Sequence, residues 1–304
     1  MTITLSRIKS FVNNRFRAPR SKHPEHDALL HMLQYYHHEI SDLRSKVRYL
    51  LANTPDALPP IRQTYDSFDY QWDKLNLGPA LLSDASFKAT VKQTISNYTQ
   101  LPESWFSGKK IIDIGCGQGR FSYGFSLLKA NITAIDQSQH AVENTQKALL
   151  EQAPDAVVKQ HDLLTPLPFG RDFDLVWSYG VLHHTGNTHL AFNHIHGLVK
   201  PNGYLFLMLY GEPQLGNIPS FQEQAEYARL RQLTKNLSFE EKIEVLLNEK
   251  PKEHLHGWFD AISPAINDTY SLEEIKSWLI TAGFGEIQVT SSSTNHHVIA
   301  KKIA

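Results

Sequence analysis

The sequence predicts an α/β protein in which a mostly parallel β-sheet carries helices on both faces. Two observations lead to this fold class. Between about residues 109 and 210, short apolar runs alternate with segments of helical pattern, which is typical of parallel strands joined by right-handed crossovers. A glycine-rich turn, Gly115 to Gly119, follows the first apolar run, as in folds that bind a nucleotide-like ligand where a strand meets a helix.

Length and composition limit the classes of protein to consider. A chain of 304 residues can form one large domain with an appendage or two modest domains. The net charge of −1 does not suggest a general binder of nucleic acid or of membranes. The single cysteine excludes an internal disulfide framework and a multi-cysteine zinc site. Since the sequence also has neither a long apolar run nor a secretory h-region, a cytoplasmic protein without a membrane span is expected.

Residues 1–60 are expected to form a basic arm and a separate helix. The first 24 residues are basic and hold no acid, which is typical of a solvated arm, of a segment that contacts an anionic partner or, in a eukaryotic source, of a mitochondrial presequence. Within 25–52, apolar residues follow alternating steps of four and three, which predicts a helix with a heptad stripe. The stripe packs either onto the chain's own domain or onto a second copy, which would give a homodimer. Prolines near Pro59 end this helix.

Residues 61–108 are expected to form a helical segment that precedes the main domain. Tyr65, Phe68, Tyr70 and Trp72 lie close together, and aromatic side chains at this spacing belong either to a core or to a ligand cage. A cage would suit a cationic ligand, because cations are attracted to aromatic faces. In that case the segment is a lid over the ligand site.

The glycine-rich turn indicates which ligand the fold binds. A dinucleotide site requires G-x-G-x-x-G, but here the third position after Gly117 is Arg120 and the third glycine is Gly119. Asp113, two residues before Gly115, would repel a pyrophosphate and suits a ligand with a positively charged amino group. The segment from Asp113 to Gly119 resembles the first motif of class I S-adenosylmethionine-dependent methyltransferases.

That resemblance implies a Rossmann-like sheet of seven strands, with the last strand antiparallel beside the fifth, and S-adenosylmethionine as the cofactor. Asn131 to Asp136 is the expected second strand, and its final carboxylate is placed to bind ribose hydroxyls. Asp162 and Leu163 resemble the family's adenine-binding position, and Phe173 to His184 and Gly197 to Leu207 resemble its fourth and fifth motifs. The expected cofactor-binding residues are Asp113, Gly115, Cys116, Gly117, Gly119, Asp136, Gln137, Asp162, Leu163, Ser178 and Tyr179.

The expected methyltransferase domain, 109–304, contains an insertion at about 212–270. This insertion holds two amphipathic helical stretches and predicts a helical cap that selects the substrate. Within it, Trp258 to Pro264 resembles a stretch of many bacterial small-molecule methyltransferases and either lines the acceptor pocket or braces the cap. Ser271 begins a capping box for the last helix, which is followed by two strands.

Candidate catalytic residues follow from the chemistry of methyl transfer. In-line displacement requires alignment and exclusion of water, and a general base is needed only where the acceptor must lose a proton. His184, and then His183, are the best-placed bases because they follow the fourth strand at the ligand edge. The alternative role for such an imidazole is to order its loop by hydrogen bonding. The weaker candidates are His254, His256, Tyr210 and Asp260. No metal is expected, since the histidine pairs lack the i, i+4 spacing of a zinc pair.

The sequence thus predicts transfer of a methyl group from S-adenosylmethionine to an O, N or C atom of a small molecule. Methylation of tRNA or protein is the alternative among enzymes, with the basic arm steering the polymer, although the charge makes nucleic acid a less favoured partner. A non-catalytic scaffold that keeps the fold is the alternative of another class. The displaced third glycine disfavours a nicotinamide dehydrogenase.

Overall fold

The structure is a computed structural model, and it describes residues 58–75, 82, 84–212, 218–292 and 294–303. Contacts divide the chain into two compact units, 1–47 and 48–304, and every described residue belongs to the second. The predicted basic arm and heptad helix therefore lie outside the described residues. Within the described part, no helix is both long and apolar enough to cross a membrane.

Strands and helices alternate through the central part of the chain, as the sequence predicts. The helical elements are α3 (Leu58–Lys74), α5 (Ala85–Thr99), η2 (Glu103–Phe106), α6 (Arg120–Leu127), α7 (Gln139–Leu149), η3 (Leu182–His184), α8 (Thr188–His196), α9 (Ile218–Leu233), α10 (Phe239–Glu249), η4 (Lys252–His254), α11 (Leu255–Ile262) and α12 (Leu272–Thr281). The strands are β1 (Lys110–Ile114), β2 (Asn131–Asp136), β3 (Val157–Gln160), β4 (Phe173–Tyr179), β5 (Val199–Tyr210), β6 (Phe284–Ser292) and β7 (Asn295–Lys302).

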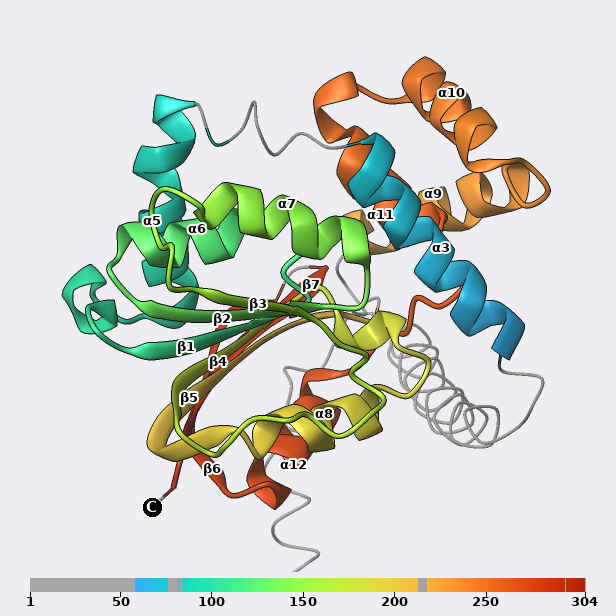
Figure 1. Cartoon of the computed structure of the whole chain (residues 1–304). Helices are drawn as coiled ribbons and strands as arrows, with labels where there is room; N and C mark the ends of the chain where they lie inside the picture. Colours follow the sequence, from blue (N-terminus) through green and yellow to red (C-terminus); the bar gives the residue numbers. More distant parts are fainter. Residues whose placement is uncertain (1–57, 76–81, 83, 213–217, 293, 304) are drawn as a thin grey trace, which may run out of the picture. The chain divides into compact units, whose positions relative to one another are not determined.

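A seven-stranded sheet organises the described residues (Figure 1). Its strand order is β3-β2-β1-β4-β5-β7-β6. The pairs from β3 to β5 are parallel, whereas β7 lies between β5 and β6 and is antiparallel to both. The mostly parallel Rossmann-like sheet is therefore confirmed, including the last strand that runs antiparallel beside the fifth.

Helices cover both faces of this sheet, which confirms the predicted layers. On one face, α5, α6 and α7 pack against side chains such as Ile111 and Trp177. On the other face, α8 and α12 pack against side chains such as Val176 and Leu205. All seven residues of β4 except Tyr179 are buried, as expected for a parallel strand covered on both sides. The apolar runs of the sequence are thus the middle of the sheet.

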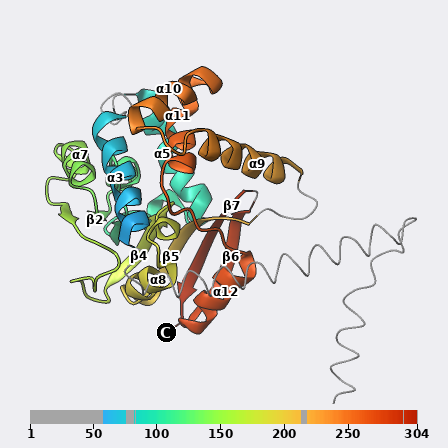
Figure 2. The same cartoon turned by 90° about the vertical axis from the view of Figure 1, so that its right-hand side faces the viewer.

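The predicted insertion is helical. Leu230 of α9, Leu246 of α10 and Phe259 of α11 form a buried cluster of their own. Tyr70 of α3 packs on this cluster, with its ring centroid 5.2 Å from that of Phe239 and 6.1 Å from that of Phe259. Figures 1 and 2 show α3 together with α10 and α11 beside one end of the sheet.

Local sequence explains where several helices begin. The Ser271 side chain accepts a hydrogen bond from the Glu274 amide and Glu274 bonds back, which is the predicted capping box at the start of α12. Ser138 caps α7 by accepting a hydrogen bond from the Ala141 amide. Ser138 also ends the turn after β2, so this cap fixes the chain next to the strand end that carries Asp136.

Candidate active site

A cavity of about 580 Å³ lies at the carboxyl ends of β1, β2, β4 and β5. Open α/β sheets bind ligands at this edge, and the volume is in the range that holds a small-molecule ligand. Helix α3 supplies one wall through side chains that recur at helical spacing. These side chains are Ile61, Thr64, Tyr65, Phe68 and Trp72. From the cap, α11 contributes His256, Gly257 and Asp260.

The glycine turn between β1 and α6 needs glycine for its backbone. Gly115, Gly117 and Gly119 have φ of +70°, +54° and +80°, in the region that side chains rarely adopt. The turn is held to β2 because the amide of Gly115 donates to the Ile135 carbonyl at 2.8 Å. A Cβ on Gly117 would lie 3.1 Å from the Trp72 indole. The bare backbone therefore lets α3 close directly over the turn.

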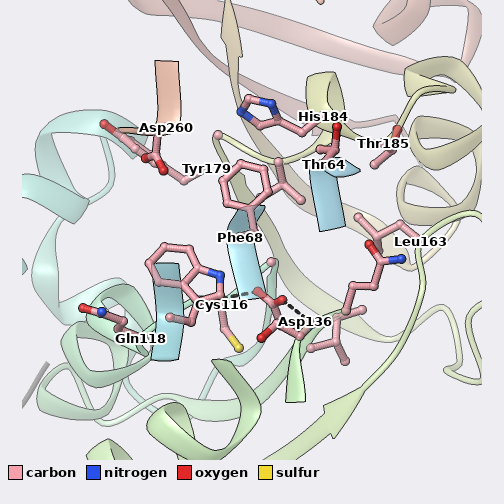
Figure 3. A pocket seen from close by; sticks show the side chains of 18 of the residues that line it. Thr64, Phe68, Cys116, Gln118, Asp136, Leu163, Tyr179, His184, Thr185 and Asp260 are labelled. Carbon is pink, nitrogen blue, oxygen red and sulfur yellow. Dashed lines mark hydrogen bonds between the residues drawn. The ribbon is translucent and has the colours of Figure 1, made fainter. Parts of the chain in front are cut away.

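Asp136, at the end of β2, is hydrogen-bonded to this turn and lies near Cys116 in Figure 3. Its Oδ2 accepts a hydrogen bond from the Gly117 amide at 3.0 Å, and its Oδ1 accepts one from the Ser138 amide at 2.9 Å. Burial raises the pKa of the Asp136 carboxyl to about 6, against these amides, which favour the ionised form. The carboxylate faces the cavity and fixes the glycine turn at the same time.

Asp113 lies deeper, on β1, and is buried. Its Oδ2 accepts a hydrogen bond from the Ser122 hydroxyl at 2.6 Å. Burial raises the pKa of Asp113 to about 7, and the nearby negative charge of Asp136 also raises it. A positively charged ligand group beside Asp113 would favour the ionised form, because an opposite charge lowers the pKa of a carboxyl.

Most of the predicted cofactor-binding residues line this cavity. Those that do are Asp113, Gly115, Cys116, Gly117, Asp136, Gln137, Asp162, Leu163 and Tyr179. Gly119 is not among the lining residues and instead caps α6. Ser178 is also outside the lining, and its buried hydroxyl has no hydrogen-bond partner among the described residues. Successive residues of a strand point to opposite faces, so only Tyr179 of this pair reaches the cavity.

The structure separates the two predicted bases. His184 lines the cavity, and its Nδ1 lies 2.8 Å from the Ile266 carbonyl oxygen. Since a carbonyl only accepts, Nδ1 carries the proton and Nε2 keeps its lone pair. Burial lowers the pKa of His184 to about 4. His183 is fully buried outside the lining, between the rings of His184 and Tyr210, at centroid distances of 4.1 Å and 3.9 Å.

Three of the four weaker catalytic candidates lie in the cavity wall. Tyr210, His256 and Asp260 line the cavity, whereas His254 does not. His256 Nδ1 accepts a hydrogen bond from Gln71 Nε2 at 3.0 Å, and its Nε2 donates to the Leu75 carbonyl. This histidine therefore joins the cap to α3.

Sequence reasoning missed Arg120, although it directly follows the glycine turn. Arg120 is the only lysine or arginine among the described residues that line the cavity. Its guanidinium carbon lies 4.4 Å from the Phe121 ring centroid and 5.5 Å from that of Tyr179. Its position in the sequence could have indicated this role, because it begins α6, where a side chain can reach a ligand held by the preceding loop.

Comparison with known proteins identifies the central part of the chain. The family described as "Methyltransferase domain" matches residues 112–205, which run from β1 into β5. The chain contains a class I S-adenosylmethionine-dependent methyltransferase domain. The mitochondrial ubiquinone biosynthesis O-methyltransferase of Schizosaccharomyces pombe is 35% identical to this chain over 117 residues, which are 34% of this chain and 38% of that protein.

Two further relatives resemble the methyltransferase domain. The ubiquinone biosynthesis O-methyltransferase of Dechloromonas aromatica is 32% identical over 104 residues, which are 33% of this chain and 44% of that protein. The chain thus spans less than half the length of these curated relatives. A methyltransferase solved in complex with the Trm112 methyltransferase activator of Haloferax volcanii has a TM-score of 0.50 and 15% identity, covering 78% of this chain and 98% of that chain. At this identity the likeness shows the fold alone.

The residues of the methyltransferase domain fit S-adenosylmethionine, the methyl donor of the class. Gly115 and Gly117 bring bare backbone to the cavity lining at positions where a Cβ would contact Val181 or Trp72. Asp113 is a buried carboxyl that a positive amino group would stabilise, and the aromatic face of Phe68 suits a sulfonium. Among the described residues, no group of three or more His, Cys, Asp or Glu side chains could hold a metal ion.

Proposed function

We propose that the protein transfers a methyl group from S-adenosylmethionine to an oxygen, nitrogen or carbon atom of a small molecule. The observation that carries the proposal is the single cavity that joins the glycine turn to the cap. Figure 3 shows Asp136 and Cys116 at one end of this cavity and His184 and Asp260 at the other, with Phe68 between them. The cofactor supplies a methyl group on a positively charged sulfur, which is open to in-line attack.

The carboxyl end of the sheet supplies the side chains that would hold the cofactor. Asp136 would accept hydrogen bonds from the ribose, and Asp162 and Leu163 would border the adenine. Asp113 would stabilise the amino group of the methionine part. Arg120, the cation of the lining, would bind its carboxylate.

Helix α3 would exclude water and align the reactants. It is bound to the cofactor side of the cavity, because Ser138 donates to Asp69 at 2.6 Å and Asn144 donates to the Trp72 carbonyl at 2.8 Å. It is bound to the cap side as well, because Gln63 donates to the Ser263 carbonyl at 2.8 Å. A closed site of this kind favours displacement by holding donor and acceptor in line.

The wall made by α3 supports a small acceptor over tRNA or protein, since a polymer would need this helix displaced. The two curated relatives are named as ubiquinone biosynthesis O-methyltransferases, which supports an oxygen acceptor. The scaffold alternative is disfavoured by the polar groups that face the cavity.

A cytoplasmic location and self-association through residues 25–52 stay predictions. Comparing the sedimentation of the full chain with that of a chain starting at Ile61 tests the self-association.

Calorimetry with S-adenosylmethionine, S-adenosylhomocysteine and NAD tests the proposed function. We expect both S-adenosyl compounds to bind and NAD not to bind. Methyl transfer to a metabolite extract would then identify the acceptor. Failure of both S-adenosyl compounds to bind at millimolar concentration would overturn the proposal.

A further inference from the structure

We propose that Asp260 is the proton acceptor of the reaction, and that the methyl acceptor is a small molecule without an anionic group that reacts at a hydroxyl or an amine. This inference rests on the methyl transfer proposed above. It replaces His184, which the sequence favours, by a side chain from the cap.

The geometry around Asp260 points to a hydrogen-bond donor in the cavity. Asp260 lies on α11 and, like His184, lines the end of the cavity away from Asp136 (Figure 3). Its Oδ1 atom is buried and has no hydrogen-bond partner among the described residues. A buried acceptor without a partner is costly, which keeps Oδ1 ready to hold a proton inside the protein. The residue as a whole is half-buried and borders the cavity, so a hydroxyl or amine of a bound molecule would donate to the cavity side of its carboxyl.

The two candidate bases differ in basicity. Burial raises the pKa of Asp260 to about 7, although Gln71 and Arg120 act to lower it. Burial lowers the pKa of His184 to about 4. A general base works best when its pKa is near the working pH, because it is then both ionised and able to hold the proton. His184 is always neutral near pH 7 but binds a proton only weakly, so it suits a positioning role beside Phe68.

The groups that face Asp260 come from four other elements. Gln71 of α3, which is fully buried, donates a hydrogen bond to its carboxyl and also contacts His256. Arg120 of α6 acts on it from the cofactor side, and Tyr210 of β5 lies close enough for the Asp260 charge to raise the pKa of its phenol. Arg231 of α9 donates from Nε to the carbonyl of Ala261, the next residue of α11, at 2.8 Å. None of these groups donates a hydrogen bond to Oδ1 of Asp260.

The charges of the lining define the class of acceptor. Besides Asp260, the acids of the lining are Asp113, Asp136, Asp162 and Glu253. Among the described residues, Arg120 is the only arginine or lysine of the lining to balance these negative charges, and the carboxylate of the cofactor would bind to it. Apart from the cofactor's sulfonium, an anionic acceptor would therefore meet like charges from the acids of the lining, whereas a neutral or cationic molecule would not.

The proposed step is balanced in atoms and charge. A lone pair of the acceptor oxygen or nitrogen forms a bond to the methyl carbon. The bond between that carbon and sulfur breaks, and its electron pair stays on sulfur as a neutral thioether. The proton of the hydroxyl or amine passes to the Asp260 carboxylate, which later releases it to water.

Transfer of a radioactive methyl group from S-adenosylmethionine to three probes tests the proposal. The probes are 4-ethylphenol, benzylamine and the anionic 4-hydroxybenzoate. We expect labelling of the phenol or the amine and not of 4-hydroxybenzoate. With the labelled probe, kcat should rise with pH through about 7 in the wild type. Asp260→Asn should lower kcat by at least roughly 100-fold and abolish that rise, while the affinity for S-adenosylhomocysteine stays unchanged.

Two variants complete the design. Asp172→Asn removes an exposed carboxyl that pairs with Lys110 at 2.6 Å, far from the cavity lining, and should keep wild-type kcat. His184→Asn should keep the rise of kcat with pH, because Asp260 is still present. The proposal is overturned if Asp260→Asn keeps both kcat and the pH profile, if 4-hydroxybenzoate is the best probe, or if neither other probe is labelled although the cofactor binds. Absence of cofactor binding by the wild type would instead refute the proposed function itself.

Discussion

Replacing Gly115 by alanine tests the close fit between the glycine turn and the loop after β4. Gly115 has φ of +70°, and a Cβ built on it would lie 2.3 Å from Cγ2 of Val181 and 2.7 Å from Cγ1. Gly108 has almost the same φ, +72°, but nothing lies within 4 Å of a Cβ at that position. Gly108→Ala is therefore a matched control that carries the backbone cost without the steric overlap.

The expected magnitudes follow from these two distances. A non-glycine residue in the left-handed region costs about 1–2 kcal/mol, and both variants carry that cost. Forcing a methyl group into an occupied site adds about 1–3 kcal/mol, and only Gly115→Ala carries this second cost. We therefore expect the free energy of unfolding to fall by about 1–2 kcal/mol in Gly108→Ala and by about 2–5 kcal/mol in Gly115→Ala.

Urea unfolding followed by circular dichroism measures these losses, provided that the transitions are two-state. Val181→Ala removes both methyl groups that a Cβ on Gly115 would overlap, so it should relieve the second cost in the Gly115→Ala background. The coupling energy from the double-mutant cycle should then be about 1–3 kcal/mol. Equal losses in Gly115→Ala and Gly108→Ala, together with no coupling to Val181, would refute the reasoning.

Three further predictions concern the same end of the sheet. Asp136→Asn places an amide donor against one of the two backbone N–H groups that the carboxylate accepts, so S-adenosylhomocysteine should bind about 1–3 kcal/mol more weakly by calorimetry; unchanged affinity contradicts the role of this carboxylate. Ser138→Ala removes the 2.6 Å hydrogen bond to α3, so that ligand should dissociate faster in stopped-flow measurements, whereas Ser271→Ala, which removes a helix cap outside the cavity lining, should leave dissociation unchanged. Asp113 has a pKa raised from 3.8 to about 7 by burial, so between these pH values the folded protein binds a proton that the unfolded chain has released, and the wild type loses stability as pH rises. The stability advantage of Asp113→Asn should accordingly grow by up to about 1.4 kcal/mol per pH unit across that window in urea unfolding, and a constant difference would show that Asp113 does not titrate there.

The cofactor end of the cavity could be predicted from sequence because topology alone brings its residues together. In a parallel sheet, the carboxyl ends of neighbouring strands meet at one edge. Asp113, Asp136 and Asp162 each lie at or just beyond a strand that the apolar runs reveal. Their proximity therefore follows from the strand order, without any knowledge of side-chain packing.

The orientation of adjacent residues could not be predicted in the same way. Ser178 and Tyr179 are consecutive on β4, and His183 and His184 are consecutive in η3. Neighbouring side chains in regular structure point in different directions, so one member of each pair faces the cavity and the other does not. The pattern of apolar residues predicts whether a segment is a strand or a helix. Where both sides of a short segment are buried, it does not predict which side chains face the cavity.

The acceptor end depends on contacts between distant parts of the chain. Gln71 and His256 are 185 positions apart, and Gln63 and Ser263 are 200 apart. The aromatic cluster before the domain divides accordingly, with Phe68 and Trp72 in the cavity wall and Tyr70 in the cap cluster. Tyr70 thus belongs to a core, whereas the ligand cage stays a prediction for Phe68 and Trp72, which line the cavity. Sequence places Asp260 only among the weaker catalytic candidates, because its environment is made by distant elements, α3 and β5.

Helix α3 also has a consequence for ligand exchange. It is hydrogen-bonded at one side to Ser138 and Asn144 and at the other to the Ser263 carbonyl and His256. In the proposed reaction, this one helix would cover both the spent cofactor and the methylated product, so it would have to move before either could leave. We expect the spent cofactor and the methylated product to dissociate with the same rate constant, that of the movement of α3 away from the cavity. This rate would then set the upper limit of turnover.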